Sequence, residues 1–184
     1  ERGYGFFGAV NNGKIENINL DNFSIDTNVV GTGGICGFLH DSKLSNCNAK
    51  GYINGTHNIG LLVGEASTES KIINSCTSGK IYSQQQDAQF VGGLLGHCVD
   101  SFIENCYSSS KIEVLNDGSI GGLIGRVAKS TSEVKNSYCN LEKSGTTKEI
   151  GAIQDGAIAD KCDAKDSKTN PFLPKEMQIK TNLQ

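Results

Sequence analysis

The sequence has no tryptophan, only two prolines and one methionine among its 184 residues, and it lacks a long uninterrupted hydrophobic run. A membrane-spanning helix needs about 18 or more consecutive apolar residues, so we expect no membrane insertion. The 17 lysines and arginines are scattered along the chain, and the net charge is −3. Because nucleic-acid binding depends on clustered positive charge, we also expect no nucleic-acid partner.

Sequence patterns for metal binding and catalysis are missing as well. The three histidines, His40, His57 and His97, form no H-E-x-x-H motif and no pair at metal-ligand spacing. His97 precedes Cys98, but adjacent side chains of a strand point to opposite faces, which argues against a shared site. A cysteine–histidine pair that meets only in the folded chain stays open as an alternative. We therefore expect no catalytic residue, no metal site and no cofactor.

The chain does contain a repeat. A short glycine-rich phrase closes at intervals of 29, 27, 32 and 29 residues, at Gly8, Gly37, Gly64, Gly96 and Gly125. An apolar-x-Asn phrase follows each one and ends, at intervals of 29, 28, 31 and 31 residues, at Asn17, Asn46, Asn74, Asn105 and Asn136. A fixed period of about 20–50 residues is typical of a solenoid.

Each repeat indicates short strands, as in residues 90–96, 102–108 and 111–114, where alternating runs are separated by Gly, Asn, Asp and Ser. Equivalent strands of successive repeats should stack in parallel about 4.8 Å apart. We therefore predict an all-β fold, a parallel β-solenoid of about five repeats of 27–32 residues, over residues 1–150. Residues 151–184 should form a degenerate repeat, beginning near residues 150–153, and an irregular terminal segment with a possible short helix at 175–180.

The repeated glycines and asparagines are assigned structural roles. A glycine at a fixed place in each repeat indicates a tight turn or a close backbone contact. The asparagines should lie at or near a bend, where stacked amides can hydrogen-bond from coil to coil. We expect this column to stabilise the stack rather than to bind a ligand.

Seven cysteines leave at least one unpaired. Five of them fall in columns of apolar or small residues when the repeats are aligned: Cys36, Cys47, Cys98, Cys106 and Cys139. We expect most of the cysteines to be reduced core residues, because buried cysteine behaves as a small hydrophobe. Cys76 lies one step off its column and should face solvent, and Cys162 lies beyond the clear repeats.

Exposed aromatic side chains are the usual anchors for carbohydrate and protein ligands. Tyr107 and Tyr138 occupy the same repeat position and should face outward from neighbouring coils. Two interpretations stay open, a cross-coil pair that stabilises the sheet or a ligand-binding patch. Tyr52 and Tyr82 are candidates for a similar outer edge in the third strand of the repeat.

An enzyme that cleaves glycans on this kind of fold would need clustered carboxylates. The repeat column that contains acids also contains a base, a polar residue and an apolar residue: Glu16, Ser45, Ile73, Glu104 and Lys135. Carboxylates are therefore not clustered along this column, and we expect a protein without enzymatic activity.

The two phrases resemble the GLUG repeat, whose usual form is roughly G-G-L-[VI]-G, a gap, and I-x-N-C-Y-A/S. Residues 92–96 and 103–109 match this form closely; residues 121–125 and 134–139 match it with departures at Ser137 and Cys139. The resemblance extends over residues 3 to about 145. It implies a β-solenoid from a large secreted or surface-anchored bacterial protein, such as an adhesin-like protein or a region flanking an IgA-cleaving metalloprotease. It supplies no catalytic residue.

We therefore expect a module of a bacterial cell-surface or secreted protein that acts in adhesion and binds a glycan or protein of a host or neighbouring cell. The alternatives are a rigid spacer that presents another domain, and an accessory region of a secreted protease or glycan-acting enzyme. Because no leader follows Glu1, we expect a mature or excised fragment of a larger chain, located outside the cell.

Overall fold

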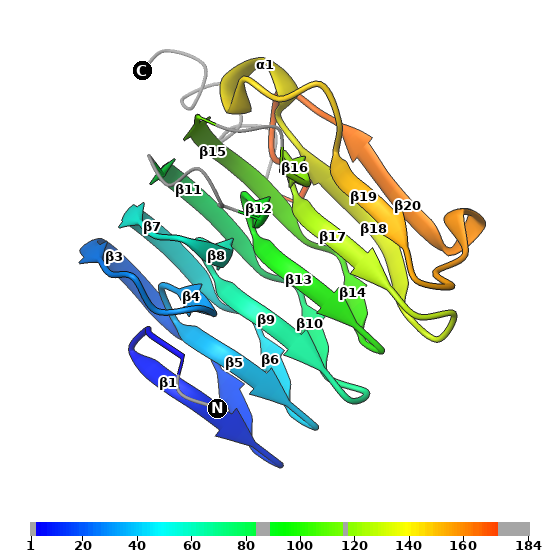
Figure 1. Cartoon of the computed structure of the whole chain (residues 1–184), viewed down its shortest axis with the longest axis horizontal. Coiled ribbons are helices and arrows are strands. Elements are labelled where there is room, and N and C mark those ends of the chain that lie inside the picture. The colour runs from blue at the N-terminus through cyan, green and yellow to red at the C-terminus, as the bar shows by residue number, and fades with distance from the viewer. Residues whose placement is uncertain (1–2, 84–88, 116–117, 173–184) are drawn as a thin grey trace.

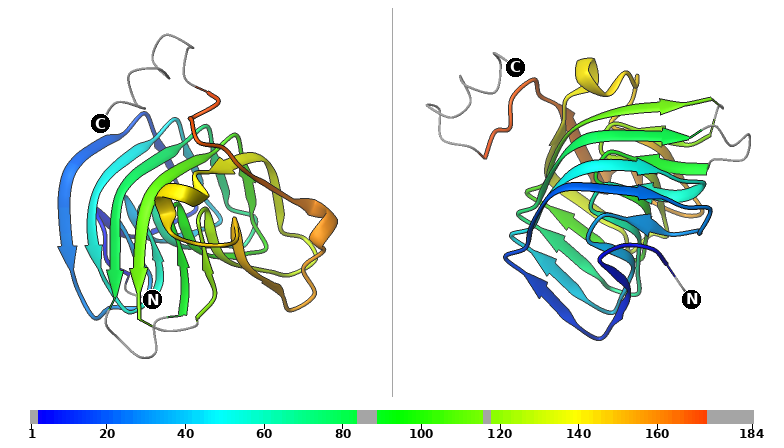
Figure 2. Two further views of the ribbon diagram at one scale, coloured as in Figure 1. Left: turned by 90° about the horizontal axis from the view of Figure 1, so that it is seen from above. Right: turned by 90° about the vertical axis from the view of Figure 1, so that its left-hand side faces the viewer.

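A computed structural model describes residues 3–83, 89–115 and 118–172, and over these ranges the chain winds into a stack of parallel β-coils (Figure 1). Seen from above, successive coils follow one another around a shared interior (Figure 2). The predicted fold class, an all-β parallel β-solenoid of about five turns, is confirmed.

Three parallel sheets run along the stack. The first sheet contains β1 (Phe7–Asn11), β5 (Cys36–His40), β9 (Val63–Ser67), β13 (Leu95–Val99), β17 (Ile124–Ala128) and β19 (Ile150–Gln154). The bent sheet turns a corner in each coil and contains β2 (Lys14–Glu16), β3 (Asn19–Asp26), β6 (Lys43–Ser45), β7 (Asn48–Asn54), β10 (Lys71–Ile73), β11 (Cys76–Ser83), β14 (Phe102–Glu104), β15 (Tyr107–Val114), β18 (Glu133–Cys139) and β20 (Cys162–Asp166). The short sheet contains β4 (Thr32–Gly33), β8 (His57–Gly60), β12 (Gln89–Gly92) and β16 (Ile120–Gly121).

The register between coils matches the alignment of the sequence repeats. In the first sheet Val63 pairs with Cys36 and Leu95, and Leu95 pairs with Ile124. The five closing glycines take equivalent places in their strands: Gly8, Gly37, Gly64, Gly96 and Gly125. Main-chain hydrogen bonds between neighbouring coils therefore hold each coil in place, whereas contacts within a single coil would not be enough.

The closing glycines are required because another part of the main chain lies against them. A Cβ atom at Gly96 would lie 2.4 Å from main-chain atoms of Asn58 and Ile59 in the preceding coil. Gly125 is in the same situation, at 2.5 Å from main-chain atoms of Phe90 and Val91. A side chain at either place would push the short sheet away from the first sheet.

The strand boundaries differ from the sequence expectation in two places. Residues 90–96, expected as one strand, turn a corner between β12 and β13. Residues 102–108, also expected as one strand, bend at Asn105, whose φ is 53°. The chain then runs without a break through β15, so the expected third strand is the second half of that strand. Period-two patterning marks inward and outward residues, but it does not mark corners made by left-handed residues.

The main hydrophobic core fills the space between the sheets and contains all five cysteines predicted to face inward: Cys36, Cys47, Cys98, Cys106 and Cys139. Each of the five has a relative exposure of 0%, which confirms the predicted burial. A second cluster, which includes Ile53, Ile59 and Ile81, packs between the short sheet and the far end of the bent sheet. All seven cysteines of the chain are free thiols.

Beyond Cys139 the chain forms a partial sixth coil. Ile150 of β19 pairs with Ile124, and β20 pairs with β18, so the degenerate repeat expected near residue 150 is part of the stack. β19 crosses the boundary expected between residues 150 and 151. Two short helices connect these strands, α1 (Leu141–Ser144) and the 3-10 helix η1 (Ala159–Lys161). The helix expected at 175–180 lies outside the described residues.

Alanine at a closing glycine should destabilise the fold. For Gly96→Ala we expect the free energy of unfolding to fall by about 3 kcal/mol or more, because main chain rather than a flexible side chain blocks the new Cβ. Gly55→Ala is the matched control, since its nearest neighbour is the end of the Ile59 side chain at 3.2 Å. Urea unfolding measures both, and equal midpoints for the two variants would contradict the close approach.

Alkaline pH should also destabilise the fold. Burial raises the pKa of Cys36, Cys98, Cys106 and Cys139 from 9.0 to about 12. As the pH rises from 9 to 12, the unfolded state loses protons that the folded state keeps, so the free energy of unfolding falls. Urea midpoints should decline over this range, and Cys106→Ala should make the decline shallower. An unchanged slope in this variant would show that the Cys106 thiol does not contribute.

Candidate functional site

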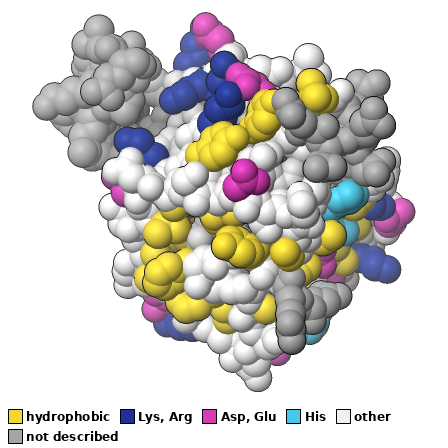
Figure 3. All heavy atoms as spheres, turned by 60° about the vertical axis from the view of Figure 1, so that its left-hand side comes forward, with side chains coloured by type: hydrophobic (Ala, Val, Ile, Leu, Met, Phe, Trp, Pro, Cys, Tyr) yellow, Lys and Arg dark blue, Asp and Glu magenta, His cyan; other side chains and the backbone are white. Residues whose placement is uncertain are grey.

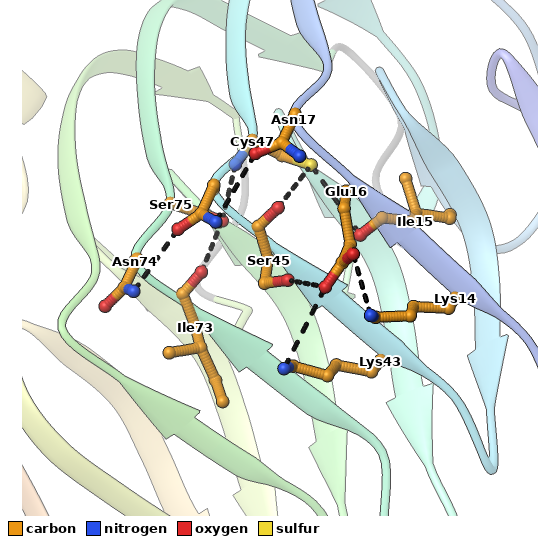
Figure 4. Close-up of polar contacts among 11 residues, drawn as sticks. Lys14, Ile15, Glu16, Asn17, Lys43, Ser45, Cys47, Ile73, Asn74 and Ser75 are labelled. Carbon is orange, nitrogen blue, oxygen red and sulfur yellow. Dashed lines mark hydrogen bonds and ion pairs between the residues drawn. The ribbon is translucent and has the colours of Figure 1, made fainter.

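The asparagine column forms a hydrogen-bonded ladder along one corner of the stack, part of which is drawn in Figure 4. The Nδ2 amide of each asparagine donates to Oδ1 of the asparagine one coil earlier: Asn46 to Asn17 (3.4 Å), Asn74 to Asn46 (3.3 Å), Asn105 to Asn74 (3.2 Å) and Asn136 to Asn105 (2.5 Å). The coil-to-coil hydrogen bonds expected between these asparagines are present.

The ladder residues also make the corner itself. Their φ angles lie between 43° and 59°, a left-handed region that asparagine tolerates better than most residues with a side chain. Their main-chain N–H groups bind the next coil, as from Asn74 to the Glu104 carbonyl (3.0 Å) and from Asn105 to the Lys135 carbonyl (3.2 Å). The main-chain hydrogen bonds and the side-chain amide bonds thus both hold the row of asparagines at the corner.

Where serine follows the ladder asparagine, as at Ser75 and Ser137, its hydroxyl adds an inward hydrogen bond that was not predicted from the sequence. Ser75 Oγ accepts the main-chain N–H of Cys47 at 3.1 Å, and Ser137 Oγ accepts that of Cys106 at 3.2 Å. Figure 4 shows the first of these bonds beneath the ladder. The signal in the sequence is the alternation of cysteine and serine from coil to coil in this column, which by itself predicts only small core residues.

Tyr107 and Tyr138 pair across neighbouring coils, as predicted, but Tyr107 is not an exposed residue. Its relative exposure is 5%, because residues 167–172, here called the strap, cross over it. Its hydroxyl donates to the carbonyl of Ser167 at 3.3 Å, and burial raises the pKa of Tyr107 to about 12. The expectation of an exposed Tyr107 is wrong, because the repeat pattern says nothing about a covering segment outside the repeats.

The strap is anchored to the last full coil. The Ser167 N–H donates to the carbonyl of Cys139 at 2.7 Å, which extends the pairing of β20 with β18. At the far end of the strap the ring of Phe172 meets Tyr138 edge-on, with ring centroids 5.8 Å apart. Tyr138 is half-buried, and its hydroxyl donates to Asn136 Oδ1 at 3.0 Å. Tyr138 therefore links the strap to the asparagine ladder.

A groove of about 390 Å³ lies between the ladder and the strap. Four successive coils and the strap supply its lining: Asn48, Asn74, Ser75, Cys76, Asn105, Asn136, Asn170 and Phe172. Cys76 lies on the outer side of the sheet, as predicted, but it is half-buried, and its thiol donates to Asn48 Oδ1 at 2.8 Å. Burial raises the pKa of Cys76 and keeps it a thiol. The groove is thus lined by amides, hydroxyl, thiol and aromatic groups.

None of the four candidate tyrosines, Tyr52, Tyr82, Tyr107 and Tyr138, is among the residues that line the groove. Tyr52 and Tyr82 are half-buried on the outer face of the bent sheet, but in different columns, because Tyr52 pairs with Lys80 whereas Tyr82 pairs with Asn54. Lys80 Nζ lies 5.5 Å from the ring centroid of Tyr82 and 2.5 Å from the carboxylate of Glu113. These residues form a mixed aromatic and charged strip rather than a stacked tyrosine pair.

A cluster on the outer face of the first sheet was not identified from the sequence. His97 Nδ1 lies 3.4 Å from Glu65 Oε2, and the Phe90 ring packs against His97 (centroids 4.8 Å apart) and against the Arg126 guanidinium (4.6 Å). Within the described residues, His97 Nε2 and Arg126 Nε are buried without a hydrogen-bond partner. Cys98 is buried in the core, so the two neighbours occupy opposite faces, as predicted.

A second hollow, of about 430 Å³, lies at another corner of the coils. Its lining mixes charges of both signs with one aromatic ring: Glu69, Lys71, Asp100, Phe102, Thr131, Glu133 and Lys161. Lys71 Nζ already lies 5.8 Å from the centroid of the Phe102 ring. Charges of both signs line this hollow, so it favours neither anionic nor cationic ligands.

The end of the stack that carries β1 and β3 is open. Both strands are terminal in their sheets, so each has one edge without a neighbouring strand among the described residues. Hydrophobic side chains gather on the face seen when this end is turned forward (Figure 3). Phe6 is 68% exposed, Tyr4 48% and Val30 47%. These side chains form an exposed apolar patch at this end of the stack.

Within residues 3–83, 89–115 and 118–172, no group of three or more His, Cys, Asp and Glu side chains is placed to hold a metal ion. The same part of the chain has no helix of the length and apolar character needed to cross a membrane. Carboxylates on the bent sheet pair with lysines instead, as in Glu16 with Lys14 (2.8 Å) and Glu133 with Lys135 (2.9 Å).

Comparison with known proteins gives a partial match. A segment of 81 residues, 43% of this chain, is 33% identical to a protein of Evansella cellulosilytica named "Putative Gly-rich membrane protein". The match covers 9% of the length of that relative. No protein-family model matches the chain, and no solved structure matches it.

Substitution of Asn105 should separate the two roles of a ladder residue. Asn105→Ala removes the amide hydrogen bonds and leaves a Cβ-bearing residue in the left-handed region, so we expect the free energy of unfolding to fall by about 2–3 kcal/mol. Asn105→Gly removes the same bonds but suits that backbone, so the loss should be about 1 kcal/mol. Urea unfolding compares the two variants. Wild-type stability in both would contradict a stabilising ladder.

Proposed function

We propose that this chain is a non-enzymatic repeat module of a secreted or cell-surface bacterial protein, and that it acts in adhesion by binding an extracellular ligand. The observation that carries the proposal is the groove between the asparagine ladder and the strap. Its lining combines side chains from four coils with an aromatic wall, in a volume of about 390 Å³, which lies in the usual range of ligand sites. The ligand class is a glycan or a protein of a host or neighbouring cell.

The construction of the stack supports a binding role. The ladder fixes Asn74 and Asn105 of the groove lining by hydrogen bonds to the coils on either side. A surface that is already ordered loses little conformational entropy when a ligand binds, which favours affinity. The groove therefore resembles a preformed site rather than a flexible surface.

The charged residues support a protein without catalytic activity. The carboxylates of Glu16 and Glu113 each bind lysine side chains on the sheet surface, and none lines the groove. Hydrogen bonds from Lys111 and Lys80 hold the pKa of Glu113 at about 2, far below the value that a general acid needs. The chemistry of the face is thus that of recognition.

The location outside the cell rests on the GLUG-like phrases and is compatible with the free thiols. Burial raises the pKa of Cys98 and Cys106 to about 12, so almost no reactive thiolate forms at neutral pH. Low thiolate content and burial both slow oxidation of these thiols to disulfides. The relative of Evansella cellulosilytica, named as a membrane protein, suggests a parent chain at the cell envelope.

Two alternative functions make different use of this structure. A rigid spacer would use the continuous ladder and core but would not need the groove. An accessory region of a secreted protease or glycan-acting enzyme would have its active site in another domain of the parent chain. Binding by the isolated chain separates adhesion from the spacer.

The test immobilises the purified chain and measures binding to a panel of host glycans and matrix proteins at near-physiological salt. Tyr138→Ala removes the ring against which Phe172 of the groove wall packs, and Tyr82→Ala alters the mixed aromatic and charged strip. Tyr4→Ala, at the open end, is the matched control. We expect saturable binding. Its affinity should fall about tenfold or more in Tyr138→Ala or in Tyr82→Ala, and should not change in Tyr4→Ala. A folded chain that binds no member of the panel would support the spacer instead.

A further inference from the structure

We infer that the groove between the asparagine ladder and the strap binds a linear, uncharged polysaccharide that lies along the stack axis. This inference rests on the proposed ligand-binding function and specifies the ligand class and the site. It follows from the hydrogen-bonding capacity of the ladder, the absence of charge, the aromatic wall and the spacing of the coils.

The ladder leaves hydrogen-bonding capacity unused. An asparagine amide has two N–H donors and an oxygen with two lone pairs. In Asn74 and Asn105 the ladder uses one donor and one lone pair of each amide. Each amide therefore retains one N–H and one lone pair at the groove. A donor beside an acceptor matches a pair of neighbouring sugar hydroxyls, each of which can both donate and accept.

The groove contains no charge that would compensate a charged ligand. None of its eight lining residues is an acid, a lysine, an arginine or a histidine. Taking a carboxylate or sulfate group out of water without a partner is unfavourable, so an acidic glycan is excluded from close contact. An uncharged chain of hydroxyl groups meets no such penalty.

The strap supplies the apolar surface that a sugar ring needs. Phe172 lines the groove, is 42% exposed, and has its ring fixed against Tyr138. Aromatic rings present a flat apolar face to the C–H groups of a sugar while amides on the opposite wall bind its hydroxyls. The strap thus converts a flat sheet corner into a two-sided site.

The repeat of the groove matches the repeat of a polymer. Successive asparagines are separated by the distance between neighbouring strands, about 4.8 Å. This step is close to the length of one sugar unit in an extended β-linked polysaccharide. Three ladder asparagines line the groove, Asn74, Asn105 and Asn136, so about three consecutive sugar units can each meet an equivalent amide.

A peptide strand fits this place less well. Peptides usually join a sheet by pairing with the free edge of a strand. The strands beside the groove have no free edge, because β10 pairs with β6 and β14, and β11 pairs with β7 and β15. The groove offers side-chain groups alone, which favours the polysaccharide.

The test measures binding of the purified chain to uncharged linear β-linked gluco-oligosaccharides, from the monosaccharide to the hexasaccharide, by isothermal titration calorimetry. Affinity should rise with length and level off at about three units. Asn105→Asp, which adds a charge to the ladder, and Phe172→Ala, which removes the aromatic wall, should each weaken binding about tenfold or more. Asn12→Asp is the matched control, an exposed left-handed asparagine outside the groove lining.

The outcomes distinguish the inference from the proposed function. Circular dichroism and urea unfolding first establish that each variant is folded. Oligosaccharide binding that survives both groove variants, or that is independent of ligand length, would overturn the groove site while leaving a binding function. Binding to proteins or acidic glycans of the wider panel, with none to neutral oligosaccharides, would overturn the ligand class alone. A folded chain that binds nothing would overturn both.

Discussion

Parallel coils stacked in register place each residue directly against its equivalent in the next coil, and the rest of this structure depends on that constraint. A residue type that suits one position of a coil must also pack against the same or a similar residue at that position in the coils above and below. Asparagine satisfies this condition at the corner, because its amide both donates and accepts, as from Asn74 to Asn46 and from Asn105 to Asn74. Glycine satisfies it at places such as Gly96, where another strand leaves no room for a side chain.

The same constraint explains which parts of the structure could be predicted from the sequence. The columns of Gly96, Asn105 and the buried cysteines followed from alignment of the repeats, since alignment in sequence and stacking in space are equivalent in a solenoid. Corners were harder to predict, because a left-handed residue such as Asn105 interrupts a strand without disturbing the alternating pattern. The expected strand breaks were displaced for this reason.

The candidate site was only partly predictable, because part of it comes from outside the repeats. The alignment placed Tyr107 and Tyr138 in one column correctly, but the strap buries Tyr107 and provides Phe172 as a wall. The cluster around His97 depends on Phe90, which reaches over the first sheet from a left-handed position. Contacts of this kind join non-equivalent residues, and periodicity carries no information about them.

Asparagines that stack in register and form one wall of the groove should have their side-chain amide protons close together. Nuclear Overhauser contacts between these protons, measured on the isotopically labelled chain, would show this arrangement. In-register stacking predicts contacts of Asn74 with both Asn46 and Asn105, and a ligand in the groove should change these amide resonances when a neutral oligosaccharide is added. Amide protons of Asn74 that contact neither asparagine would contradict the stacking, and resonances unchanged by a ligand that binds would contradict the groove.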